Sequence, residues 1–172
     1  LLALLDLELR AQRGKQALGL GDNSIGERVP GLLAELGVAH IQVYQSDKAV
    51  VSKLEYARWV AAAIAYVVIQ QRDAVGLATF DTMLHPALRP QSTTQQLREL
   101  CRVLEQTPAG GESNIGAMLQ EFAERQVRRG VVILISDFFD DFDSLERGLR
   151  HLSFRRHDVI LVQVIDPAEA AF

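Results

Sequence analysis

The residues best placed to do chemistry are carboxylates that follow a stretch typical of a buried strand. Residues 131–135 are five consecutive aliphatic residues, the pattern of a parallel strand covered on both faces, and Asp137 follows directly after Ser136. Ligands of an open parallel sheet bind beyond the carboxyl ends of its strands, so Asp137 is expected at the functional edge. Asp140, Asp141 and Asp143 come next, and clustered carboxylates suit a hard cation such as Mg²⁺. The structural alternative is that Asp137 caps a turn and the other three begin a helix, where they complement its dipole.

A second candidate is the turn Gly-Gly-Glu-Ser at residues 110–113, which leads into a predicted helix. Ser113 is a good N-cap, and capping alone accounts for it. If Ser113 and Asp137 converge, a hydroxyl and a carboxylate share one site. The four histidines show no metal-ligand spacing, no nucleophile motif is visible, and no glycine-rich phosphate loop joins a strand to a helix. Cys101 is the only cysteine, which excludes a disulfide framework and a cysteine-based zinc cluster.

Alternating strands and helices must position these residues. Ser52 and Glu55 have the spacing of a capping box, and apolar residues then recur at helical intervals up to Arg72. Strands alternating with helices of ten or more residues predict an α/β fold, a doubly wound and mostly parallel sheet with helices on both faces. The further elements that we expect are strands at 75–80, 131–135 and 159–165, and helices at 93–106, from 113 or 114, and at 142–152.

The first 43 residues and one later segment give weaker signals. Leucines among charges favour a helix within residues 1–18, and five glycines between 14 and 31 indicate a loop or linker. A short helix at 30–36 ended by Gly37, and a weak strand at 38–44, follow from their patterns. Residues 83–88 are expected to pair with the strand at 75–80 as an edge strand, because Pro86 cannot donate to a ladder.

The composition excludes several function classes. With 172 residues, 48% of them hydrophobic and 23% charged, the chain reads as one soluble globular domain. A net charge of −4 argues against nucleic acid as a partner. The longest apolar run, residues 59–69, is far shorter than the ~20 residues of a membrane span. No export signal is visible and the single cysteine suits a reducing compartment, so we expect a cytoplasmic location.

Several motifs also stand in a fixed order along residues 44–170. They are Ser-Lys-Leu-Glu-Tyr-Ala at 52–57, Gln-Arg-Asp-Ala-Val-Gly-Leu at 71–77, Gly-Gly-Glu-Ser at 110–113, Ile-Leu-Ile-Ser-Asp at 133–137, and Asp-Pro-Ala-Glu at 166–169. Their order resembles the bacterial family called domain of unknown function 58, which is related to von Willebrand factor A domains, and residues 5–11 resemble its amino-terminal segment. The resemblance implies a helix-flanked sheet of the von Willebrand factor A type and, in full members, a metal-ion-dependent adhesion site.

The resemblance places two residues in that adhesion site. Asp137 stands where the family has an aspartate after its fourth strand, and Ser113 where it has the threonine of a Gly-Glu-Thr loop. The remaining motif, Asp-x-Ser-x-Ser, would fall near residues 37–41, which hold no ligand for a hard cation, although Ser46 and Asp47 lie nearby. We therefore expect residues 44–172 to form the von Willebrand factor A-like domain, with a first strand at 38–44, and residues 1–43 to be poorly matched. Either the metal loop has been lost naturally, or a deletion or frame slip lies upstream of Tyr44.

Three functions follow from this inventory. The resemblance implies a non-enzymatic protein-interaction module that acts beside a MoxR-type AAA+ ATPase, with weak or lost Mg²⁺ binding and no membrane span. The alternative is a Mg²⁺-dependent phosphoryl-transfer or hydrolytic enzyme that uses Asp137 with Asp140 or Asp141, but it lacks a visible nucleophile, base or phosphate cradle. A structural domain without a function of its own is the third, and it follows if the coding sequence is disrupted.

Overall fold

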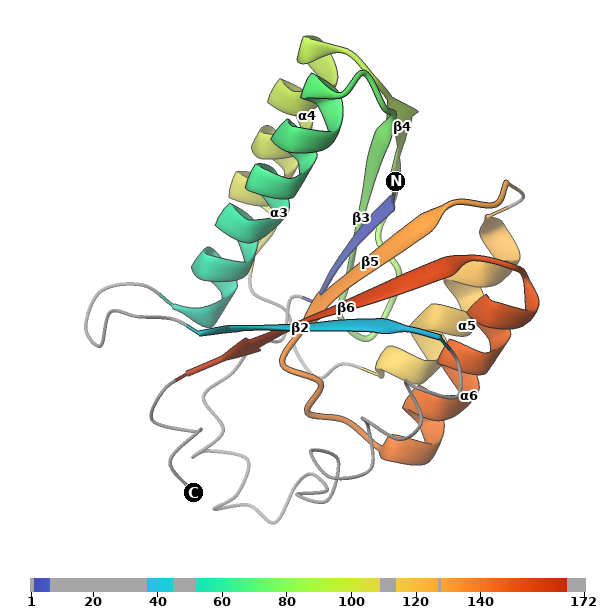
Figure 1. Ribbon diagram of the computed structural model, residues 1–172. Coiled ribbons are helices and arrows are strands. Elements are labelled where there is room, and N and C mark those ends of the chain that lie inside the picture. Colours follow the sequence, from blue (N-terminus) through green and yellow to red (C-terminus); the bar gives the residue numbers. More distant parts are fainter. Residues whose placement is uncertain (1, 7–36, 45–51, 109–113, 127, 167–172) are drawn as a thin grey trace.

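A six-stranded sheet organises this α/β protein, with its strands in the order β2-β6-β5-β1-β3-β4 (Figure 1). The computed structural model describes residues 2–6, 37–44, 52–108, 114–126 and 128–166. The strands are β1 (Leu2–Asp6), β2 (Ala39–Tyr44), β3 (Val75–Phe80), β4 (Leu88–Gln91), β5 (Val131–Ser136) and β6 (Asp158–Ile165). The helices are α3 (Lys53–Gln70), α4 (Thr94–Gln106), α5 (Ile115–Arg125) and α6 (Phe142–Phe154).

Parallel pairing brings the ends of five strands to one edge of the sheet. β1 pairs in parallel with both β3 and β5, β5 pairs with β6, and β6 pairs with β2. Only β4 is antiparallel within the described sheet, and it pairs with β3 at the edge. The carboxyl ends of β1, β3, β5, β6 and β2 therefore lie on the same side of the molecule, which is where ligands of such sheets bind.

The core lies on both faces of the sheet because alternate residues of the strands point in opposite directions. Val132 and Leu134 of β5 pack with residues of α5 and α6, whereas Ile133 and Ile135 pack with residues of α3 and α4. This two-sided burial explains why β5 reads as an unbroken apolar run. The sheet with helices packed on both faces confirms the α/β class that the sequence predicted.

The amino-terminal segment corrects the sequence prediction. We expected a helix within residues 1–18, but Leu2–Asp6 is a strand in the centre of the sheet, paired on both sides. Its run of apolar residues is the pattern of a central parallel strand, and pairing with two neighbours outweighs the helical preference of leucine. The strand expected at 38–44 is confirmed as β2 (Ala39–Tyr44), which lies at the edge of the sheet, whereas β1 and not β2 is the first strand.

The edge strand next to β3 is also shifted from its expected place. We expected residues 83–88 to pair with β3, whereas β4 is Leu88–Gln91, and only an isolated bridge joins Leu84 to Phe80. Hydrogen bonds hold the residues between β3 and β4 in a turn, including one from the Met83 N–H to the Asp81 carboxylate. The proline within the edge strand is Pro90 and not Pro86.

Helix α3 begins where its capping signal places it. The Glu55 N–H donates to Ser52 Oγ over 3.1 Å and the Ser52 N–H donates to Glu55 Oε2 over 3.0 Å, which completes the predicted capping box of α3. Thr93 caps α4 by a single bond, in which its Oγ1 accepts from the Gln96 N–H over 3.1 Å. Within the described residues, no helix combines the length and apolar character needed to cross a membrane.

Two glycines let α5 and α6 approach closely. A Cβ added to Gly116 of α5 would lie 2.1 Å from the backbone oxygen of Ser144, which is in the first turn of α6. A Cβ added to Gly148 would lie 2.9 Å from the backbone oxygen of Gly116. Both distances are far below van der Waals contact, so this pair of helices requires glycine at both crossing positions.

Candidate functional site

Aspartates mark the carboxyl ends of four parallel strands. Asp6 is the last residue of β1, Asp81 and Asp137 follow β3 and β5, and Asp166 follows β6. The strand register places Asp6 level with Phe80 and Leu5 level with Ile135, so Asp81 and Asp137 lie one step beyond Asp6 on either side. Of these four aspartates, only Asp137 was expected at this edge from the sequence.

Asp137 forms a buried ion pair with Lys53. Lys53 is the first residue of α3, and its Nζ lies 2.8 Å from Asp137 Oδ2. Their side chains are 5% and 11% exposed. The other carboxylate oxygen, Oδ1, accepts a hydrogen bond of 3.3 Å from the Phe139 N–H. Both oxygens of the predicted metal ligand therefore have donors from the protein.

The loop that carries Asp137 has an unusual backbone. Ser136 is fully buried, and its Oγ accepts a hydrogen bond of 2.9 Å from the Phe138 N–H. Phe138 has φ of 57°, in the left-handed region that bulky residues avoid, and its side chain is buried. The side chain of Gln163 on β6 donates to the Asp137 carbonyl over 3.4 Å. These contacts fix the direction in which the Asp137 carboxylate leaves the strand.

The other predicted carboxylates have structural roles. Asp141 is the N-cap of α6 and accepts a hydrogen bond of 2.7 Å from the Ser144 N–H, and Asp143 lies in the first turn of the same helix. Asp140 instead accepts a hydrogen bond from the Ile115 N–H, the first amide of α5. The structural alternative is thus confirmed for Asp141 and Asp143, while Asp140 serves the neighbouring helix.

The predicted partner of Asp137 cannot be placed. Ser113 lies outside the described residues, as do Ser46 and Asp47. The N-cap of α5 is Asn114, whose Oδ1 accepts a hydrogen bond of 3.0 Å from the Ala117 N–H. The α5 start that we expected at 113 or 114 is therefore at Asn114.

The described side chains do not fit a Mg²⁺ ion. Among the residues that the structure describes, no three histidine, cysteine, aspartate or glutamate side chains lie close enough to share a metal. An ammonium group, which repels a divalent cation, lies within hydrogen-bond distance of the Asp137 carboxylate. In this pair the Lys53 ammonium balances the charge of the Asp137 carboxylate.

Asp81 forms a second ordered pair at the same edge. Its Oδ2 lies 2.9 Å from Nε2 of His85. Burial raises the pKa of Asp81, but hydrogen bonds from the Met83 N–H, the His85 ring and the Thr82 N–H lower it more, so the pKa lies below its ordinary value. The spacing of these residues at i and i+4 was visible in the sequence, but it carried no known motif.

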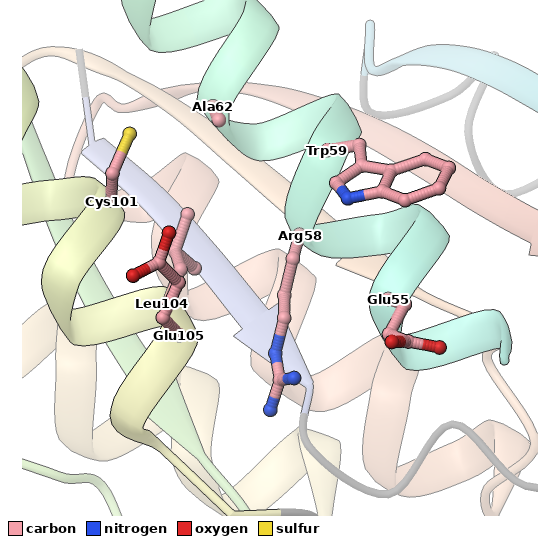
Figure 2. A pocket seen from close by; sticks show the side chains of 7 residues that line it. All are labelled: Glu55, Arg58, Trp59, Ala62, Cys101, Leu104 and Glu105. Carbon is pink, nitrogen blue, oxygen red and sulfur yellow. The ribbon is translucent and has the colours of Figure 1, made fainter. Parts of the chain in front are cut away.

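A surface groove of about 330 Å³ lies between α3 and α4 (Figure 2). Arg58 extends from α3 beside α4, where its guanidinium donates to the Thr107 carbonyl at the end of that helix. Burial, together with the nearby Glu105 carboxylate, raises the pKa of the Cys101 thiol above its ordinary value. A thiol with a raised pKa is a poor nucleophile.

The outer side of α3 beside this groove exposes large apolar side chains. Trp59 is 58% exposed, Tyr66 52% and Val67 53%. Trp59 and Tyr66 are seven residues apart, close to two helical turns, so they lie on the same stripe of the helix. Residues 59–70 contain no charged side chain. We call Trp59, Tyr66 and Val67 the α3 contact face.

Comparison with known proteins adds one relationship. The family model described as a protein of unknown function, DUF58, matches residues 28–172. A search of the curated proteins found no match. The matched segment covers most of the chain, including Lys53, Asp137 and the α3 contact face.

Proposed function

Since the chain belongs to the DUF58 family, we propose that it is a non-enzymatic protein-interaction module of the von Willebrand factor A type that acts with a MoxR-type AAA+ ATPase. The α3 contact face is the observation that carries the proposal. Trp59 and Tyr66 are exposed on one stripe of the uncharged segment 59–70 of α3. Such side chains are costly to leave in water, and tryptophan and tyrosine are the residues that most often dominate protein contacts.

The sheet supports the von Willebrand factor A-like part of the proposal. Its parallel strands have helices on both faces, as a doubly wound fold requires. β1 lies at the centre of the sheet, where that fold has the strand that precedes its first metal-binding motif. If β1 is that strand, the motif begins at Asp6 and not within residues 37–41. The two serine positions of Asp-x-Ser-x-Ser are then Glu8 and Arg10 in the sequence.

Weak or absent Mg²⁺ binding is the second part of the proposal. Lys53 already neutralises Asp137, and the motif that starts at Asp6 has an arginine in the place of a hydroxyl ligand. A module of this kind would hold its partner through apolar contact on α3 and would not use a carboxylate that completes a metal's coordination. Isothermal titration with Mg²⁺ or Mn²⁺ should give no saturable heat at micromolar concentrations, and micromolar affinity would contradict this part.

Binding to the ATPase tests the interaction itself. The partner is a MoxR-type ATPase encoded in the same genome, immobilised with its nucleotide at constant concentration, and the affinity is read by biolayer interferometry. We expect the double variant Trp59→Ala, Tyr66→Ala to bind at least about tenfold more weakly, because truncation of each interface aromatic commonly costs more than about 1 kcal/mol.

Phe154 provides the matched control. It is 83% exposed on α6, a helix that packs on the opposite face of the sheet from α3. Phe154→Ala should bind within about twofold of the wild type, since an isolated exposed apolar residue outside a contact contributes little. Equal losses in both variants, or no binding by the wild type, would contradict the proposal.

A further inference from the structure

We propose that the Lys53 ammonium is the resident cation of the strand-end site, meaning that it neutralises Asp137 where a divalent ion would otherwise do so. The site would then hold its geometry without a metal. Lys53 belongs to the motif at 52–57 and directly follows the Ser52 cap, but the family resemblance assigns it no role.

The position of Lys53 shows that the ammonium is not there to stabilise its own helix. Lys53 is the first residue of α3, after the Ser52 cap, where the helix dipole is positive and disfavours a cation. Its side chain is also almost fully buried, which removes the ammonium from water. Both effects oppose the charge, and the contact of 2.8 Å with Asp137 offsets them.

Asp137 in turn depends on a cation at this point. Its side chain is 11% exposed, and a buried carboxylate without a countercharge is strongly unfavourable. Its Oδ1 accepts a hydrogen bond from the Phe139 backbone N–H, which carries no net charge. The contact with a cation is therefore made by Oδ2, which accepts from Lys53. Asp6 ends the neighbouring strand one step before Asp137, which adds a second carboxylate position to the same edge.

The ion pair also joins two parts of the chain that are 84 residues apart. It ties the amino end of α3 to the carboxyl end of β5 and so fixes the helix that carries the α3 contact face. Only this link to the α3 contact face rests on the proposed function. Neutralisation of Asp137 by Lys53 does not require that any partner binds.

Thermal unfolding of Lys53→Met tests the inference, since methionine keeps the apolar stem and removes the ammonium. We expect the wild-type Tm to differ by less than about 1 °C between EDTA and 5 mM Mn²⁺, because a ligand that does not bind the native state does not stabilise it. The Tm of Lys53→Met should fall by at least about 5 °C in EDTA. Mn²⁺ should restore at least about half of that loss, as it can occupy the vacated position beside Asp137.

Two further variants make the result specific. In Lys53→Met, Asp137→Asn the negative charge is gone as well, so Mn²⁺ should have no effect. Arg58→Met removes a second cation of α3 that bonds to the Thr107 carbonyl and not to a carboxylate, and its Tm should not respond to Mn²⁺. If Lys53→Met is unfolded in EDTA, the readout becomes the folded fraction regained in Mn²⁺, measured by circular dichroism.

The outcomes separate this inference from the proposed function. A Lys53→Met protein that does not respond to Mn²⁺, or a wild type that is stabilised by it, overturns the resident cation. Neither result involves the ATPase. Conversely, loss of ATPase binding in Trp59→Ala, Tyr66→Ala is measured with the ion pair intact and says nothing about Lys53.

Discussion

Replacement of Gly116 by alanine should destabilise the protein through the contact of α5 with α6. The added Cβ would lie 2.1 Å from the Ser144 backbone oxygen, whereas ordinary van der Waals contact begins at 3.4 Å. The two helices must therefore separate by about 1.3 Å, the difference between these distances. The atom in the way belongs to the backbone, so no side-chain rotation can relieve the clash.

The magnitude follows from two opposing effects. Overpacking of a well-packed contact typically costs about 1–3 kcal/mol and occasionally more, and a clash with backbone belongs at or above the upper end. Alanine regains at most about 1 kcal/mol of helix propensity over glycine. We expect a net loss of about 2–3 kcal/mol, which corresponds to a fall in Tm of roughly 4–12 °C for a chain of this length.

Urea denaturation followed by far-ultraviolet circular dichroism measures the effect. Gly130→Ala is the control, because a Cβ at Gly130 meets nothing within 4 Å. That variant should unfold within about 0.5 kcal/mol of the wild type. A Gly116→Ala protein as stable as the wild type, or more stable, would refute the close crossing of α5 and α6.

Two further predictions concern the β3–β4 side of the sheet. The pKa of Asp81 is lowered in the folded state, so its stabilising contribution is present above the unfolded pKa of about 3.9 and is lost as the pH falls through the lower folded value. When the free energy of unfolding is measured against pH, Asp81→Asn should therefore lose less stability than the wild type below about pH 4. Parallel curves for the two proteins would contradict the assignment. The Gln96 side chain donates to the carbonyls of Val75 and Arg89 over 3.0 and 2.9 Å. Gln96→Ala should therefore lower the free energy of unfolding, measured in urea, by about 1–3 kcal/mol, whereas Gln95→Ala, at an exposed neighbouring position, should lower it by less than about 0.5 kcal/mol. Equal losses would show that the two bonds do not hold β4 to β3.

Local patterns predicted α3, β3 and β5. The capping box at Ser52 and the apolar runs of β3 and β5 are short-range signals, and each produced the expected element. The apolar run that ends at Asp6 is the same kind of signal as the one that ends before Asp137. Leucines among the charges of residues 1–18 favour a helix by local propensity, and only pairing with β3 and β5 makes Leu2–Asp6 a strand.

The candidate site was less predictable because its contacts join distant residues. The position of Asp137 past a buried strand followed from the sequence, but its partner Lys53 is 84 residues away and was visible only as part of a motif. The exposure of Trp59 and Tyr66 could not be predicted either. The apolar character of α3 on nearly all sides indicated packing against a sheet, but a sheet buries only one side of a helix.

Hydrogen–deuterium exchange of the chain, alone and bound to the MoxR-type ATPase, tests the proposed interaction most directly. The account predicts slower exchange of the backbone amides of α3 in the complex, and unchanged exchange in α6 on the opposite face of the sheet. Protection confined to α5 and α6, or no protection in α3 at saturating ATPase, would contradict the claim that this protein binds its partner through the α3 contact face.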